Sequence, residues 1–252
     1  MTAAFGGSLA DSSHSSVVMQ RTQHQLGRPQ SDQFGDVLSA VSEFGWCTLH
    51  ATPNNETSLS TLVLQIATSI GTPIPTRGRT LIDSLRPTAS SNARPRSLSA
   101  RYGKGIQPWH SDTVHQLVPA RHLVFACLDP GEAGACTVLA DWKTIIKGRD
   151  TLIAARTEPF LIRCGRHSFY STVQQPGRPF TRFDPGCMEP CRQAGRELQS
   201  AVEGASPGEA TTVDWKAGQV VIIDNWRMAH RRLDAEGSPG RTLLRVSVAG
   251  RS

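Results

Sequence analysis

Short apolar segments separated by turn residues recur through this sequence. Those with the length and composition of strands are 46–50, 122–128, 136–142, 159–164, 168–173, 219–224 and 242–248. Two other stretches, around 143–155 and 190–202, place apolar residues at helical spacing. Numerous short strands with few helices favour an antiparallel sandwich or jelly roll over a parallel α/β sheet. We therefore predict a β-rich α+β fold, namely a double-stranded β-helix (jelly roll) with flanking helices.

Two of these flanking helices are predicted before the main run of strands. The first covers 34–44, where apolar residues recur at helical spacing, and Gly45 is a typical C-terminal stop. The second covers 59–70, and Thr57 or Ser58 is expected to cap its N-terminus.

A chain of 252 residues fits one domain, and no internal linker divides it. Residues 1–30 are rich in Ser, Gly, Gln and Thr without apolar periodicity, which is typical of a disordered arm. Residues 31–252 are expected to form a single jelly-roll domain. Within it, residues 76–105 are dominated by Ser, Arg, Pro, Gly and Thr, and we predict a lid-like loop there.

The charge balance is basic, with 27 Lys and Arg against 21 Asp and Glu, a net charge of +6 and a pI near 9.3. Such a surplus can attract nucleic acid or a small anion. The arginines are spread singly, however, and neither a continuous Lys/Arg groove nor a base-stacking platform is evident. We therefore expect a small-molecule substrate and no nucleic-acid partner.

Six cysteines are too few for a disulfide scaffold in a chain of this length, so reduced thiols are expected. The N-terminus lacks the basic start and apolar core of a secretory signal. No segment approaches the roughly 20 apolar residues that span a bilayer. These features predict a soluble, cytoplasmic protein without a membrane partner, and they leave the oligomeric state open.

The residues with the clearest chemical meaning begin at 107–112. In an extended segment, residues i and i+2 point to the same face, so His110 and Asp112 can bind one ion together. The apolar segment 219–224 leads to a polar tip that presents His230. Two histidines and a carboxylate leave three octahedral positions open, which suits Fe(II). Zinc enzymes also use three protein ligands, so the residues alone leave the metal open.

Four elements follow one another along the chain. They are Trp109-His110-Ser111-Asp112, Gly134-Ala135-Cys136-Thr137, the segment 224–230 that ends at His230, and the segment 240–245 that contains Arg241. A Trp-His-x-Asp motif, a Gly-Gly-x-Thr-like turn, a distal histidine and then an arginine form the pattern of the taurine dioxygenase (TauD/TfdA) family of Fe(II)/2-oxoglutarate oxygenases. Over residues 107–248 this chain resembles that family.

The resemblance implies that His110, Asp112 and His230 bind Fe(II), with 2-oxoglutarate and O2 as co-substrates. The distal carboxylate of 2-oxoglutarate is costly to bury unless it is paired. The resemblance assigns this carboxylate to Arg241 and Thr137 as cofactor-binding residues. Arg245, four residues further along, contacts either an anionic group of the substrate or 2-oxoglutarate itself.

The resemblance also implies hydroxylation of an unactivated C–H bond in a small molecule, with release of succinate and CO2. An amino acid derivative or a biosynthetic intermediate, including an anionic one, is the expected substrate. Because the chain keeps Asp112, where related halogenases have a small residue, halogenation is not expected. Desaturation, cyclisation, epimerisation and demethylation of a macromolecule remain alternatives with the same iron chemistry. A non-catalytic jelly-roll binding module is a further alternative.

Overall fold

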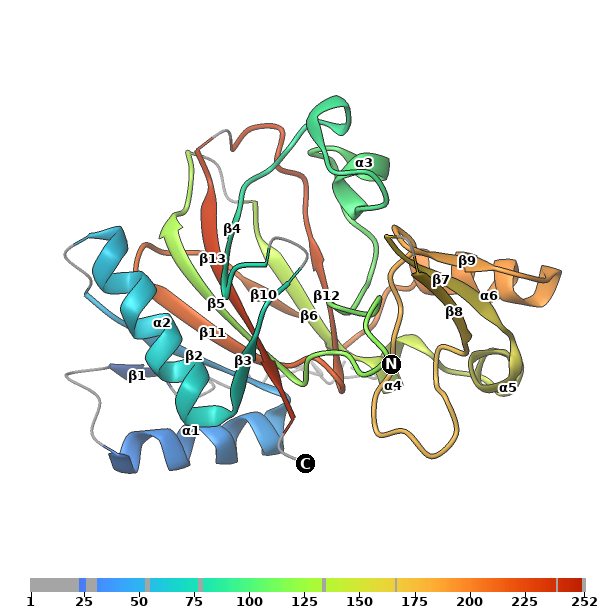
Figure 1. Ribbon diagram of the computed structural model, residues 1–252, viewed down its shortest axis with the longest axis horizontal. Helices are drawn as coiled ribbons and strands as arrows, with labels where there is room; N and C mark the ends of the chain where they lie inside the picture. The colour runs from blue at the N-terminus through green and yellow to red at the C-terminus, as the bar shows by residue number, and fades with distance from the viewer. Residues whose placement is uncertain are drawn as a thin grey trace, which may run out of the picture.

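The computed structural model describes residues 23–25, 31–52, 55–76, 79–132, 135–165, 167–238 and 240–250. Figure 1 shows a β-rich molecule with helices at its periphery, as predicted. Within the predicted N-terminal arm only Gln23–Gln25 is described, as a strand, and the rest of 1–30 lies outside the described residues. None of the helices in these ranges is long and apolar enough to span a bilayer.

The largest sheet contains seven strands and is antiparallel except at one edge. Its order is β1 (Gln23–Gln25), β2 (Trp46–His50), β11 (Gln219–Asp224), β5 (His122–Asp129), β13 (Thr242–Ala249) and β3 (Thr72–Ile74), and β4 (Ile82–Leu85) also pairs with β13. Only β1 and β2 run parallel. The strands predicted at 46–50, 122–128, 219–224 and 242–248 are thereby confirmed.

Two smaller antiparallel sheets complete the β-structure. One has the order β10 (Thr211–Val213), β6 (Thr137–Asp141) and β12 (Met228–Arg232), and the other has the order β8 (His167–Ser171), β7 (Phe160–Cys164) and β9 (Met188–Pro190). The seven-stranded sheet packs on the first of these through a buried cluster that includes Phe125, Leu139, Trp215 and Leu243. Two antiparallel sheets therefore share one core, which agrees with the predicted β-rich class.

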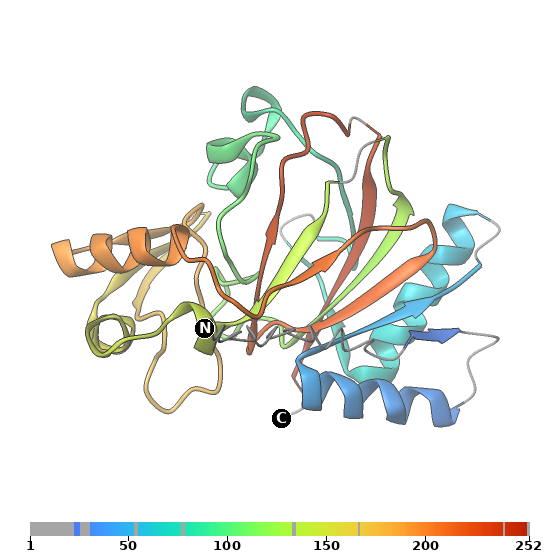
Figure 2. The ribbon, with the colours of Figure 1, turned by 180° about the vertical axis from the view of Figure 1, so that it is seen from behind.

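Helices α1 (Ser31–Phe44) and α2 (Glu56–Ile70) cover the opposite face of the large sheet (Figure 2). The N-cap predicted for α2 was wrong by two or three residues. Asn55 is the cap, and its side chain accepts from the backbone N–H of Ser58 while the Ser58 hydroxyl accepts from the Asn55 N–H. This capping box satisfies two N-terminal groups at once, which Ser58 alone cannot do.

Gly45 joins α1 to β2, as predicted, and both its backbone conformation and its close neighbours favour glycine. Its φ is 83°, in the left-handed region that favours glycine. A Cβ atom there would lie 2.5 Å from the sulfur of Met228 on β12. The chain therefore turns here at close range to the strand that carries His230.

A third layer lies on the far side of the β10-β6-β12 sheet. It consists of the β8-β7-β9 sheet with α4 (Trp142–Ile145), α5 (Arg149–Thr157) and α6 (Gln193–Glu203), and a buried cluster joins it to β6 and β12. We predicted a single helix around 143–155, but the structure has two. Gly148, with a φ of 85°, separates them.

The predicted loop 76–105 contains regular structure in its described part. It includes β4, a 3-10 turn η1 (Ser90–Asn92) and the short helix α3 (Leu98–Tyr102). β4 is a full member of the large sheet, in register with β13. The five cysteines whose side chains are described are free thiols, as predicted.

Candidate active site

His110 and His230 lie directly opposite each other on neighbouring extended segments. They form an isolated antiparallel bridge, in which each backbone N–H donates to the other residue's carbonyl oxygen at 3.0 Å. Both side chains are buried, and their ring centroids are 4.2 Å apart. Two residues 120 positions apart in the sequence are therefore held side by side by their own backbones.

The tautomer of His110 leaves one ring nitrogen available to a metal. Its Nδ1 lies 2.9 Å from the carbonyl oxygen of Pro108, and because a carbonyl only accepts, Nδ1 carries the proton. Nε2 then keeps its lone pair in the neutral ring, as in most metal-binding histidines.

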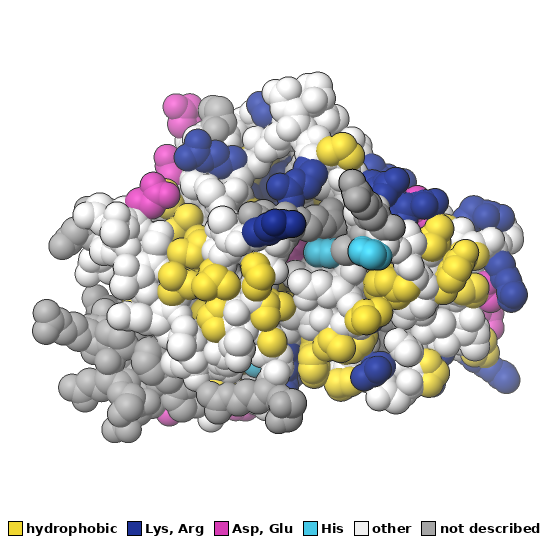
Figure 3. Space-filling view, viewed as in Figure 1, with side chains coloured by type: hydrophobic (Ala, Val, Ile, Leu, Met, Phe, Trp, Pro, Cys, Tyr) yellow, Lys and Arg dark blue, Asp and Glu magenta, His cyan; other side chains and the backbone are white. Residues whose placement is uncertain are grey.

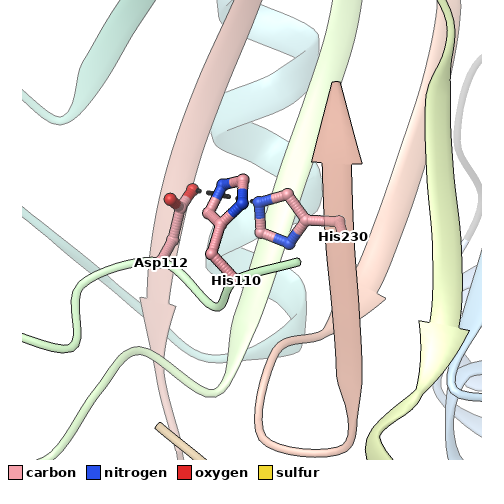
Figure 4. A group of neighbouring side chains, drawn as sticks. All are labelled: His110, Asp112 and His230. Atoms are coloured by element: carbon pink, nitrogen blue, oxygen red, sulfur yellow. Dashed lines mark ion pairs between the residues drawn. The ribbon is translucent and has the colours of Figure 1, made fainter. Parts of the chain in front are cut away.

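The ligand atoms of His110, Asp112 and His230 all lie within 4.8 Å of one another, and the three side chains point toward one another (Figure 4). This donor set fits a divalent metal.

Protonation states in this group also suit coordination. Burial lowers the pKa of His230 to about 3, and His110 acts in the same direction. Burial alone would raise the pKa of the Asp112 carboxyl, but the charges of Arg245 and the two histidines hold it well below its usual range. Near neutral pH His230 is therefore neutral and Asp112 ionised, as metal binding requires.

The backbone around Asp112 is held by Asn225, which follows β11. The Asn225 side-chain oxygen accepts from the N–H of Asp112 at 2.8 Å, and its amide nitrogen donates to the carbonyl oxygens of Asp112 at 3.1 Å and Ala120 at 2.8 Å. Asn225 is fully buried. Thr113, the residue after Asp112, has a φ of 56°. The extended segment that contains His110 and Asp112 therefore ends at Asp112, where the chain turns sharply.

Replacing Asn225 with alanine is expected to weaken divalent-metal binding by about 10- to 100-fold, the usual effect of losing a group that orients a ligand. The measurement is a Co(II) titration followed by absorbance. Gln219→Ala is the matched control, because Gln219 is a hydrogen-bonded, buried amide at the other end of β11, the strand that Asn225 follows, and lies away from the Asp112 turn. Equal metal affinity in the two variants would contradict the orienting role of Asn225.

Arg245 connects Asp112 to a second carboxylate. Its Nη1 donates to Asp112 Oδ2 at 2.5 Å and its Nη2 to Asp83 Oδ2 at 2.7 Å. Asp83 on β4 lies opposite Arg245 on β13 in the sheet register, and the Thr76 hydroxyl donates to both Asp83 oxygens at 2.6 and 2.8 Å. Burial alone would lower the pKa of Arg245, but the two carboxylates raise it. Both Nη atoms of Arg245 therefore bind carboxylates of the protein itself.

Thr137 on β6 and Arg241, the residue before β13, are in hydrogen-bond contact. The Thr137 hydroxyl accepts from Arg241 Nη2 at 3.2 Å and from Trp215 Nε1 at 2.9 Å. Arg232, two residues beyond His230 on β12, lies nearby and donates to the carbonyl oxygens of Gly103 and Gly105, each at 2.8 Å. Sequence reasoning missed Arg232, although strand alternation places it on the same face as His230.

The two guanidiniums of Arg232 and Arg241 are an unbalanced pair of buried cations. Their side chains are only 8% and 5% exposed. Burial lowers the pKa of Arg241 to about 10, and the charge of Arg232 contributes to this shift. In the described part of the chain, no carboxylate lies within ion-pair distance of either group. A buried cation pair of this kind is costly unless an anion joins it.

One cavity of about 650 Å³ is lined by the metal triad, Asp83, Thr137 and the three arginines Arg232, Arg241 and Arg245. Its inner wall is formed by β5, β6, β12 and β13, and its outer wall by β4 and the residues that follow it up to Ser99. In the space-filling view, Lys and Arg side chains lie around a central hollow in which histidine is visible (Figure 3). The predicted metal ligands and the predicted cofactor residues therefore share one open pocket.

Comparison with known proteins places this site in a family context. Residues 155–247 match the model of the family described as taurine catabolism dioxygenase TauD, TfdA family. The match includes His230, Arg241 and Arg245, whereas His110, Asp112 and Thr137 precede it. No curated protein sequence is significantly similar to the chain.

Solved structures of iron oxygenases are similar over most of the chain. An asparagine oxygenase bound to Fe(II), 3-hydroxyasparagine and succinate has a TM-score of 0.69 at 14% identity, covering 87% of this chain and 78% of its own. The non-haem iron oxygenase OrfP, bound to Fe and α-ketoglutaric acid, has a TM-score of 0.66 at 17% identity, covering 90% and 81%. A taurine dioxygenase from Burkholderia xenovorans has a TM-score of 0.61 at 16% identity, covering 89% and 82%.

At these identities the structural likeness shows the fold alone. The fold of the chain is that of non-haem iron oxygenases. The family match and the shared fold together confirm the predicted resemblance to the TauD/TfdA family of Fe(II)/2-oxoglutarate-dependent dioxygenases, which are oxidoreductases that use Fe(II), 2-oxoglutarate and O2.

Proposed function

We propose that this protein hydroxylates an unactivated C–H bond of a small molecule, with 2-oxoglutarate as co-substrate and succinate and CO2 as products. The observation that carries the proposal is the buried pair Arg232 and Arg241 beside Thr137, in the same cavity as the three metal-ligand side chains. A metal triad alone supports many reactions. A cavity with both a metal site and a buried, carboxylate-free cation pair suits a dianion that chelates the metal at one end.

In this proposal His110, Asp112 and His230 hold Fe(II), which supplies the oxidising chemistry with O2. Arg241 binds the distal carboxylate of 2-oxoglutarate through its free donors, and Thr137 adds a hydroxyl. Arg232 contributes charge from the neighbouring strand. The buried ion pair of Arg245 with Asp83 fixes the orientation of the Asp112 carboxylate. We also infer the jelly-roll topology, because two antiparallel sheets enclose the cavity in a fold shared with iron oxygenases.

The substrate is expected to be an amino acid or a related metabolite. Two structural neighbours are complexes with 3-hydroxyasparagine and with (3S)-hydroxy-L-arginine. A cavity of about 650 Å³ is within the usual range for small-molecule sites. It favours a metabolite over a macromolecular substrate for demethylation. We propose that the 79–105 segment, which supplies most of the outer wall, is the predicted lid that keeps water from the reacting groups.

The proposal is tested by adding Fe(II) and then 2-oxoglutarate to the metal-free protein without oxygen. A weak metal-to-ligand charge-transfer band in the visible is expected, and a chelator should remove it. Succinate should form once oxygen is admitted. If a folded, iron-loaded protein gives neither the band nor succinate, it does not use 2-oxoglutarate.

A further inference from the structure

Building on this proposed function, we propose that the substrate carries an anionic group, such as a carboxylate or a phosphate, and that Arg86 and Arg94 bind it at the mouth of the cavity. Both arginines line the cavity that contains the metal triad, and both are exposed. Residues that line a cavity and also reach solvent lie at its opening. An incoming substrate therefore meets these two guanidiniums before it reaches the metal.

The charges of the other cavity residues already have partners or proposed ligands. Arg245 is bound by Asp83 and Asp112, and under the proposed function Arg241 and Arg232 take the distal carboxylate of 2-oxoglutarate. The remaining acidic lining residue, Asp184, accepts from the backbone N–H of Gly186 at 2.7 Å.

Arg86 and Arg94 have no carboxylate within ion-pair distance among the residues that the structure describes. They are therefore the cavity cations left for a substrate. Arg245 was expected to contact either an anionic group of the substrate or 2-oxoglutarate. Both of its Nη atoms bind carboxylates of the chain, so we place the recognition of a substrate anion at the mouth of the cavity.

The backbone holds both arginines in place. Arg86 directly follows β4, which is hydrogen-bonded to β13, and Arg94 lies two residues after the η1 turn. Each precedes a proline, which restricts the preceding residue to extended conformations. The hydroxyl of Ser97 donates to the Arg94 carbonyl oxygen at 2.6 Å and accepts from the Ala100 N–H, capping α3. Because the backbone that carries both side chains is already ordered, binding an anion does not require this backbone to become ordered.

The other charged residues of this segment also favour the binding of an anion. Residues 79–105 contain six Lys and Arg but a single acidic residue, Asp83, which is already paired. Figure 3 shows basic side chains around the hollow on this face. A positive rim of this kind raises the local concentration of an anionic substrate at the opening.

The first test uses probes that differ in charge but hardly in shape. Succinate formation is measured with L-aspartate against L-asparagine and with L-glutamate against L-glutamine. We expect the acid to be the better substrate in at least one pair, and its KM to rise about 10-fold or more in Arg86→Gln and in Arg94→Gln. Arg79→Gln removes a charge from the same segment outside the cavity wall, and should change KM by less than about 2-fold. A preference for the amides, or equal effects of all three variants, would overturn the proposal.

The second test applies whether or not these amino acids are turned over. The protein is loaded with Zn(II) and N-oxalylglycine, which fill the metal and cofactor sites, and sulfate is the probe. Saturable shifts of the Arg86 and Arg94 Nε–Hε signals in NMR spectra are expected. Uniform, unsaturated shifts that Arg79 shares would refute the anion site. If sulfate binds but 2-oxoglutarate is never converted to succinate, the proposed function fails and the anion site stands.

Discussion

The substitution Asp112→Asn is expected to abolish succinate formation and to weaken Fe(II) binding by well over 100-fold. Loss of a group that only orients a ligand costs about 10- to 100-fold in metal affinity, and loss of the ligand charge itself should cost more. Asparagine has nearly the same shape but does not offer the anionic oxygen that balances the metal charge. Metal affinity is measured by competition with a chelating dye, and turnover by succinate release.

The control for this variant is Asp83→Asn. Asp83 and Asp112 bind the same guanidinium, that of Arg245, but only Asp112 belongs to the metal triad. Each variant therefore removes one of the two carboxylates that bind Arg245, but only Asp112→Asn also removes a metal ligand. We expect Asp83→Asn to retain metal binding within about 10-fold, because it disturbs only a group that orients the ligand. Equal losses in both variants would mean that the Arg245 ion pair, rather than ligation by Asp112, controls the site.

Much of the fold was predictable because the apolar segments of the sequence form buried strands in the structure. The strands β2, β5, β11 and β13 lie almost where the sequence places them, since each is buried and needs a continuous apolar segment. β12 was not predicted as a strand, because only Met228 and Ala229 are apolar in Met228–Arg232 and three polar residues follow them. The segment is a strand because it pairs in register with β6 and because His230 forms a bridge with His110, and its composition indicates neither contact.

The candidate site was predictable where residue type and spacing both carried chemical meaning. The structure brings the three residues of the metal triad together, and it brings Thr137 into contact with Arg241, which is 104 positions away in the sequence. Their contact depends on the packing of two sheets, which spacing alone does not determine. The resemblance to a family supplied that link.

Other site residues could not be found from the sequence. Asp83 lies in a segment that reads as a loop, and only the pairing of β4 with β13 places it against Arg245. Asn225 gave no signal because a buried amide that binds backbone groups has no characteristic spacing. The ion pairs of Arg245 could not be found for the same reason, since its partners come from two distant segments. Such roles arise from tertiary contacts rather than from local pattern.

Arg241→Gln is expected to raise the KM for 2-oxoglutarate roughly 30-fold or more while leaving the fold and metal binding intact. Truncating one partner of a buried charge pair costs about 2 to 5 kcal/mol, and each 1.4 kcal/mol is about tenfold in affinity. Removing Arg241 also relieves its repulsion with Arg232, so no loss of stability is expected in the absence of 2-oxoglutarate. The measurement is succinate formation over a range of 2-oxoglutarate concentrations, with thermal unfolding as the check on folding.

Three matched variants identify which group binds the distal carboxylate. Thr137→Val removes one neutral hydrogen bond and should raise this KM only about 5-fold. Arg241→Lys keeps the charge but not the two-pronged geometry, so its effect should lie between those of Thr137→Val and Arg241→Gln. Arg245→Gln is the decisive comparison. If Arg245→Gln raised the KM for 2-oxoglutarate and Arg241→Gln did not, the carboxylate would lie beside Arg245, and that guanidinium would have to release Asp83 or Asp112 to bind it. The two carboxylates that hold Arg245 make Arg241, whose side chain hydrogen-bonds only to the Thr137 hydroxyl among the described residues, the better partner for the co-substrate.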